Sequence, residues 1–271
     1  LSSKGMIDVL YNFADQEALS SKNQSSRVRS HPISRQRIMA LENQAVNSKY
    51  YKKQDSPEVI YRYNMIRAKL EGFLKRPDDV IRKYKNNNSD FAHYASSVAL
   101  YRKALTDQAI EKINLLIDKY PNNPWFYELK GQILYESGKI NLSIGPYEKA
   151  VKLSKGNSLL NVALASAYLA LNDKEFDTRA QYLLNQVIKL DKKNSYAWFQ
   201  LAIAEARLGN IGKADLYSAE RYFVLGDTNL ASFHAKRSKN NLKDNGPLLM
   251  RAEDIIIDSE NKQKWKRRCP V

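Results

Sequence analysis

Cysteine, glycine and proline are all scarce in this chain of 271 residues. Its only cysteine is Cys269, so no disulfide can form within the chain and no cysteine metal cluster is available. Ten glycines and eight prolines are few for a sheet protein, which needs many turns, whereas Ala, Leu and Lys are plentiful. This composition predicts an all-α protein.

Long apolar runs and recognisable catalytic motifs are also missing. No run approaches the roughly 18 residues of a membrane helix, so we expect at most peripheral membrane association. The three histidines, His31, His93 and His234, are too far apart for HExxH, the zinc-peptidase motif. No GxSxG, Walker loop or GxGxxG is present either. We therefore predict no catalytic residue, metal ligand or cofactor in this chain, and read His93 and His234 as structural.

The net charge of +15 first suggests a nucleic-acid partner. The excess is spread along the chain, however, and only the last residues form a basic cluster. A phosphate-binding surface usually concentrates its charge on one face. We therefore predict a solvated lysine-rich surface and no nucleic-acid partner.

Paired helices are indicated from about residue 91 to 258. In the stretch 123–157, small or apolar residues follow one another in steps of three to five, as in two amphipathic helices around a turn at Gly138. The pattern recurs at 194–222, and at 157–190 if about three extra residues lie in the turn near Lys174. Gly209 and Gly226 are only half a unit apart, which predicts one helix shared by two overlapping units.

These units resemble tetratricopeptide (TPR) repeats of about 34 residues, although a generic helical bundle is the alternative. Stacked TPR pairs form a concave surface lined by the first helix of each pair, which suits extended peptides. Some of the same positions also suit packing between repeats, and both interpretations stay open here. The predicted protein-binding residues are Trp125, Glu128, Gln132, Tyr135, Val162, Ser166, Tyr196, Phe199 and Arg207.

The part before the repeats is also expected to be helical, over residues 1–18, about 34–48 and 56–88, with an exposed loop at 20–30. Ser56, Pro57 and Glu58 form a good helix start, because serine caps, proline suits the first position and an acid suits the first turn.

Several motifs resemble the HtpX/BepA-like class of bacterial periplasmic zinc metallopeptidases that carry a TPR tail. They cover nearly the whole chain and read GMIDVLYNF (5–13), SHPISRQRI (30–38), YRYNMIRAKLEGFL (61–74), NPWFYELKGQILYESG (123–138), AERYFVLGD (219–227) and RAEDIII (251–257). The resemblance implies an all-α, TPR-like solenoid of helix pairs, preceded by a few helices from the end of a peptidase domain. The implied boundaries are 1–48 for the peptidase end with its His-Pro loop, 49–90 for connecting helices, 91–258 for the repeats and 259–271 for a basic tail.

The resemblance also implies a function. In this class the HExxH motif and a glutamate ligand precede the segment matching Gly5-Met6, so this chain is expected to be inactive alone, with zinc bound only in the intact protein. The implied role is protein quality control in the periplasm, and the implied partners are envelope clients, outer-membrane assembly machinery and an upstream peptidase domain. His31 would be a regulatory lid residue that reaches the zinc as an extra ligand. The alternative is that His31-Pro32 only starts a helix.

Two other functions stay open. One is a stand-alone TPR adaptor or scaffold that binds peptides or proteins, without an enzymatic part. The other is a basic nucleic-acid binder, against which the dispersed charge argues.

Overall fold

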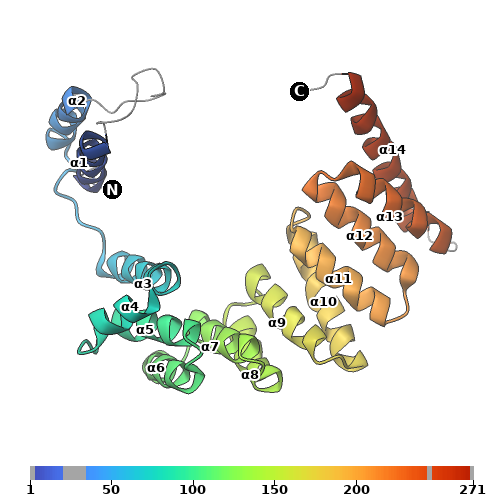
Figure 1. Ribbon diagram of the computed structural model, residues 1–271, viewed down its shortest axis with the longest axis horizontal. Helices are drawn as coiled ribbons and strands as arrows, with labels where there is room; N and C mark the ends of the chain where they lie inside the picture. Colours follow the sequence, from blue (N-terminus) through green and yellow to red (C-terminus); the bar gives the residue numbers. More distant parts are fainter. Residues whose placement is uncertain (1–3, 21–34, 243–245, 269–271) are drawn as a thin grey trace. The chain divides into compact units, whose positions relative to one another are not determined.

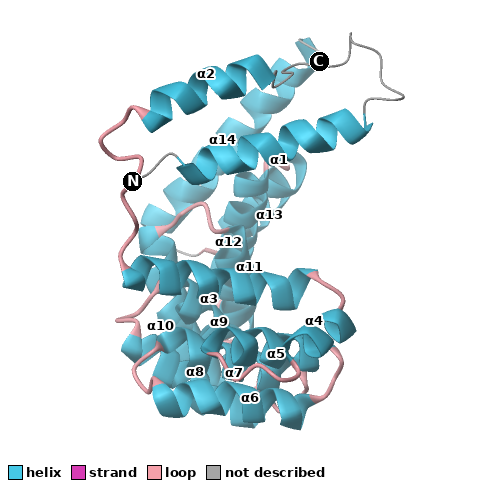
Figure 2. Ribbon diagram, turned by 90° about the vertical axis from the view of Figure 1, so that its left-hand side faces the viewer, coloured by secondary structure: helices cyan, strands magenta, loops and turns pink. Residues whose placement is uncertain are grey.

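The computed structural model describes residues 4–20, 35–242 and 246–268, and within these ranges it consists of fourteen helices and no strand (Figure 2). The predicted all-α class is therefore confirmed. Two compact units divide the chain, Leu1–Arg67 and Ala68–Val271, and each is described by itself. None of the described helices has the length and apolarity needed to span a membrane.

The first unit contains a helical hairpin of α1 (Lys4–Ser20) and α2 (Arg35–Val46). Both helices lie close to the ranges predicted for them. Among the side chains that the structure describes, the hairpin's buried core consists of Ile7, Ala14, Ile38 and Ala45. Around it, the Tyr11 hydroxyl donates a hydrogen bond to Glu42 at 2.5 Å. Of the loop predicted at 20–30, Ser20 belongs to α1, whereas residues 21–30 lie outside the described residues, as does His31.

α3 (Pro57–Leu74) begins where the sequence indicates, at Pro57. The Ser56 hydroxyl accepts a hydrogen bond from the Val59 amide at 3.4 Å, which helps to cap the first turn. The division between the two units falls within this helix, after Arg67. The short helix α4 (Pro77–Tyr84) follows and packs on α5.

Ten helices follow α4 as five successive pairs, coloured from green to red in Figure 1. The first helices of the first three pairs begin 34 residues apart, which is the length of a TPR unit. Each helix contacts its partner and the next helix along the chain. The pairs are α5 (Asp90–Arg102) with α6 (Thr106–Lys119), α7 (Pro124–Glu136) with α8 (Ile140–Leu153), α9 (Ser158–Ala170) with α10 (Lys174–Leu190), α11 (Ser195–Arg207) with α12 (Ile211–Leu225) and α13 (Thr228–Asn241) with α14 (Gly246–Arg268).

Small residues let the helices of a pair approach closely. Gly131 of α7 lies directly against the ring of Tyr147 of α8, so that a Cβ at this position would meet ring atoms at 2.8 Å. In the next pair, Ala165 and Ala180 are completely buried at the equivalent crossing. Larger side chains such as Leu184 and Leu201 then fill the space around these contacts and form a continuous core.

One predicted detail is wrong. The three additional residues expected in the turn near Lys174 lie in the helix itself, because α10 begins at Lys174 and has 17 residues, whereas α6 and α8 have 14 each. Three to four residues make one helical turn, so α10 gains about one turn at the same loop length. Asp173 caps this longer helix by accepting hydrogen bonds from the amides of Glu175 and Phe176.

α12 pairs with two neighbouring helices near the end of the chain. It contacts α11, α13 and α14, and Gly226 ends it in a left-handed conformation with a φ of 78°. Gly212, near the start of α12, lies against the end of α13. A Cβ at this position would be 3.0 Å from the carbonyl of Asn241. The helix therefore pairs with α11 and with α13, in agreement with the overlap predicted from the glycine spacing.

Candidate protein-binding surface

Asparagine side chains cap the first helices of three successive pairs. The Oδ1 of Asn123 accepts from the Trp125 amide at 3.1 Å, and that of Asn157 accepts from the Leu159 amide at 3.0 Å. Asn194 does the same for the Ala197 amide at 2.9 Å. Because α7, α9 and α11 start in the same way, they present equivalent positions on equivalent faces.

We call the nine predicted binding residues the first-helix surface: Trp125, Glu128, Gln132 and Tyr135 of α7, Val162 and Ser166 of α9, and Tyr196, Phe199 and Arg207 of α11. Their exposure differs widely. The rings of Trp125, Tyr196 and Phe199 are 40%, 51% and 36% exposed. By contrast, Val162 and Ser166 are buried, and Val162 belongs to the core around Leu184. Whether these nine residues bind a partner stays a prediction.

A hydrogen-bonded cluster joins α9 to α11. The Gln200 amide donates to the Ser166 hydroxyl at 2.8 Å and to the Tyr196 hydroxyl at 2.7 Å, while Ser166 donates to the Val162 carbonyl at 2.9 Å. Since Gln200 and Ser166 are both buried, this cluster fixes the position of the Tyr196 phenol.

Arg207 makes a second link between the same two pairs. Its guanidinium donates to the Leu169 carbonyl at the end of α9, at 2.5 Å, and lies 3.3 Å from the Asp177 carboxylate of α10. Asp177 is buried, so the arginine neutralises a carboxylate that would otherwise be costly to bury. Arg207 therefore has a structural task in addition to its predicted role at the surface.

The α7 part of the surface carries two carboxylates. Glu128 forms an ion pair with Lys69 of α3 at 2.9 Å, and both residues belong to the second unit. Glu136 accepts hydrogen bonds from the Tyr101 hydroxyl and from the Gln132 amide, the latter at 2.8 Å. Burial raises the pKa of Glu136, and burial together with the nearby Tyr196 phenol raises the pKa of Tyr135.

Sequence reasoning missed several participants in this surface, among them Tyr101, Gln200 and Arg221. The Arg221 guanidinium of α12 stands over the Phe199 ring, 4.3 Å from its centroid. Gln200 follows Tyr196 by four residues, a helical spacing that could have indicated the contact. Tyr101 and Arg221 come from other helices, so no local spacing reveals them.

Zinc, which the peptidase resemblance implies, has no fitting site in the part of the chain that the structure describes. There, no three His, Cys, Asp or Glu side chains come close enough together to hold a metal ion. His93 lies in α5, where burial and the nearby Lys112 lower its pKa. His234 lies in α13, stacked on Tyr222 with ring centroids 5.4 Å apart.

No protein-family model matches the chain. Among curated proteins, the β-barrel assembly-enhancing protease of Escherichia coli (strain K12) is 29% identical over 135 residues, which are 50% of this chain and 27% of the relative. A TPR repeat-containing protein of Methanocaldococcus jannaschii is 27% identical over 130 residues, or 48% of this chain and 22% of the relative. The chain thus spans about a quarter of the length of these relatives. Each match covers about half of this chain, whereas the motifs indicated a resemblance over nearly its full length.

Solved structures show the same fold. YrrB, a TPR protein with an unusual peptide-binding site, superposes with a TM-score of 0.51 at 17% identity, over 73% of this chain and 96% of YrrB. MamA (MSR-1 C2) gives a TM-score of 0.50 at 12% identity, over 61% of this chain and 96% of that protein. The predicted TPR-like solenoid of helix pairs is therefore confirmed.

Proposed function

We propose that the repeats bind an extended segment of another protein along the first-helix surface. The observation that supports this best is the exposed aromatic group of Trp125, Tyr196 and Phe199, beside polar side chains that neighbouring helices already hold in place. Exposed aromatic rings bury much area at little entropic cost, and fixed hydroxyl and amide groups bond a peptide backbone. YrrB, which shares the fold, has a peptide-binding site of its own.

In its finer form, the proposal is that this region holds clients for a zinc metalloendopeptidase in envelope protein quality control. The match to the β-barrel assembly-enhancing protease supports this role, and with it a periplasmic location and outer-membrane assembly machinery as a partner. The HExxH motif that holds the zinc would then lie outside this chain. His31 would be a regulatory lid residue that reaches the zinc as an extra ligand. Catalysis itself is not assigned to any residue here.

A stand-alone TPR adaptor is the second candidate. It is supported by the match to the TPR repeat-containing protein of M. jannaschii, which has similar identity and similar extent. An adaptor needs the same first-helix surface but no peptidase. The two candidates therefore share the binding step, and they differ in whether the bound protein is then cleaved.

The binding step can be tested with paired alanine variants. Y196A/F199A removes two exposed rings of the first-helix surface, and the matched control Y182A/L190A removes two exposed side chains of α10, which are 65% and 77% exposed. The probes are fluorescein-labelled 15-residue segments of outer-membrane β-barrel proteins, followed by fluorescence anisotropy. We expect Y196A/F199A to weaken binding about tenfold or more, because aromatic anchors dominate such interfaces. Equal weakening in the control would contradict the proposal.

The finer role is tested on the full-length product of the gene. We expect an HExxH motif before the segment matching Gly5-Met6 and cleavage of unfolded envelope proteins that a chelator stops and zinc restores. Y196A/F199A should then slow cleavage of long clients but not of a short peptide that spans only the active site. A full-length protein that binds these segments without the motif and without cleavage would favour the adaptor.

A further inference from the structure

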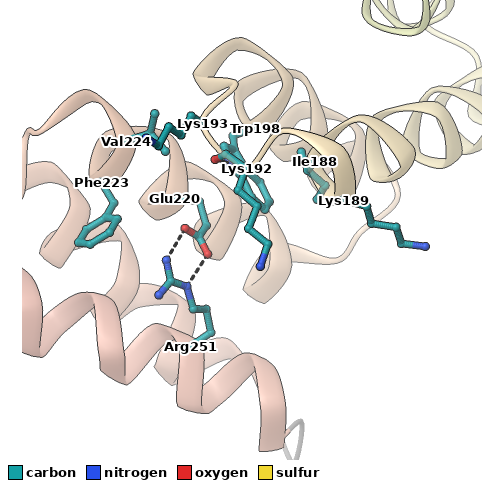
Figure 3. Close-up of a pocket in the computed structure, with 9 residues that line it drawn as sticks. All are labelled: Ile188, Lys189, Lys192, Lys193, Trp198, Glu220, Phe223, Val224 and Arg251. Carbon is teal, nitrogen blue, oxygen red and sulfur yellow. Dashed lines mark hydrogen bonds and ion pairs between the residues drawn. The ribbon is translucent and has the colours of Figure 1, made fainter. Parts of the chain in front are cut away.

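A cavity lies at the loop between α10 and α11. It has a volume of about 960 Å³, and its lining comes from α10, α11, α12 and α14 (Figure 3). None of the nine residues of the first-helix surface lines it. A volume of this size accommodates several side chains of a ligand.

The floor of this cavity is apolar and well fixed. Trp198 donates its ring N–H to the Lys192 carbonyl at 2.9 Å and packs on Tyr217, so the indole, which is 7% exposed, is held where it lines the cavity. Beside it, Phe223 and Val224 of α12 complete the apolar wall. Two cations lie near the Phe223 ring, with the Lys262 ammonium 4.6 Å and the Arg251 guanidinium 5.5 Å from its centroid.

The rim is cationic. Lys189, Lys192 and Lys193 are exposed, and none of the three forms an ion pair with a residue that the structure describes. In Figure 3 the Lys192 side chain runs past Trp198, whereas Lys189 extends outward. Asp191, between these lysines, has its carboxylate engaged by the Lys193 amide at 3.0 Å.

Only one acidic side chain, Glu220, is among the described residues that line the cavity, and it is already neutralised. Arg251 binds it in a bidentate manner, with Nε to Oε1 at 2.6 Å and Nη2 to Oε2 at 2.8 Å. Asp254 and Asp258 on α14 are near enough to help Glu220 raise the pKa of Arg251, but they do not line the cavity. The lining therefore combines a fixed aromatic floor with three lysines that have no acidic partner there.

We propose that this cavity binds an acidic segment of a partner protein that inserts one aromatic or large aliphatic side chain. The apolar side chain would cover Trp198 and Phe223, while aspartates or glutamates on either side of it would pair with Lys192 and Lys193. The three lysines favour an acidic ligand. The apolar floor favours a protein segment over a simple polyanion, because a polyanion has no apolar side chain to cover it. This site goes beyond the proposed function, and it can bind whether or not the first-helix surface does.

The test compares a charge reversal at the cavity with the same reversal one repeat earlier. K192E/K193E changes the α10–α11 loop, and the control K152E/K155E changes two exposed lysines, one in the last turn of α8 and one in the loop that follows it. The probe is a fluorescein-labelled nonapeptide with phenylalanine at the centre and alternating Asp, Glu and Gly on either side, measured at 50 and 150 mM salt. We expect K192E/K193E to weaken binding about tenfold at 150 mM salt and the control to change it less than twofold. Salt screens charges that lie far from the bound peptide, so only the lysines beside its acidic residues affect binding strongly.

Two further probes decide which class of ligand the cavity takes. Replacing the central phenylalanine by serine should weaken binding about tenfold in the unchanged protein, because the apolar floor is left uncovered. Equal binding of the serine peptide, or equal weakening by both charge reversals, would overturn the proposal. So would tighter binding of a single-stranded DNA oligonucleotide or an anionic phospholipid vesicle that K192E/K193E abolishes. Circular dichroism melts check that all variants fold.

Discussion

Glu71 illustrates how one carboxylate joins two helices. It is buried on α3, and it accepts hydrogen bonds from Lys75 at 2.8 Å, from Lys83 at 2.6 Å and from Tyr84 at 2.9 Å. Lys83 and Tyr84 belong to α4, so these bonds fasten α4 to α3. Burial alone would raise the pKa of Glu71. The hydrogen bonds from the three donors outweigh burial and lower the pKa to about 2.

Replacing Glu71 by glutamine is therefore expected to destabilise the second unit in a pH-dependent way. The folded pKa lies below the ordinary value of 4.5, so the carboxylate contributes its full stability above about pH 4.5 and loses it as the pH falls toward 2. We expect E71Q to lower the free energy of unfolding by about 1–3 kcal/mol at pH 7, with two of the donors partly solvated. Urea unfolding followed by circular dichroism measures this free energy. The difference in free energy of unfolding between E71Q and the unchanged protein should become smaller between pH 5 and pH 3.

The control for this variant is D79N, which removes an acid that pairs with Arg82 on the surface of α4. An exposed pair of this kind contributes about 0–1 kcal/mol. A gap between E71Q and the unchanged protein that stays constant from pH 7 to pH 3 would contradict the assigned pKa. A gap no larger than that of D79N at pH 7 would contradict the role of Glu71 in holding α4.

The crossing of α7 and α8 shows how pairs of elements are specified. Gly131 is needed there because the Tyr147 ring, which is itself buried, occupies the space that a Cβ would take. A helix-interior glycine normally costs about 1 kcal/mol relative to alanine, so close packing with Tyr147 must offset that cost. The small-residue spacing in the sequence predicted this crossing, because a small residue at a recurring position has a direct steric meaning.

Substituting alanine at Gly131 is expected to destabilise the second unit by about 1–3 kcal/mol, because the methyl group overpacks against the Tyr147 ring. In the background of Y147A, which itself costs about 3–5 kcal/mol, the ring is gone. There G131A should be neutral or stabilise by up to about 1 kcal/mol through helix propensity. Urea unfolding of the four proteins in this double-mutant cycle checks the coupling, and strictly additive effects would show that the ring does not restrict position 131.

At the scale of the whole molecule, the pairing of the repeat helices and the start of α3 could be predicted, because they depend on periodicity and on local capping groups. The start at Pro57 is an example, since a capping side chain and a proline act within one turn. The segment 56–88 was expected to be helical, but its division into α3 and α4 was not predicted. The additional turn of α10 was placed wrongly, because sequence spacing does not tell whether three residues extend a loop or a helix. Tyr101 and Arg221 escaped prediction for a related reason: their partners Glu136 and Phe199 lie on other helices.

The two units should also differ in local stability. Among the described side chains of the α1–α2 hairpin, four apolar residues are buried, Ile7, Ala14, Ile38 and Ala45, and a core of that size supports little stability by itself. In the second unit, Leu164 and Leu201 belong to a core that runs through consecutive repeats, and opening one helix there exposes its neighbours. We expect amide hydrogens of α1 and α2 to exchange about a thousandfold or more faster than those of α9 and α11, measured by mass spectrometry at pH 7. Equal protection would mean that the hairpin derives its stability from more than its own core.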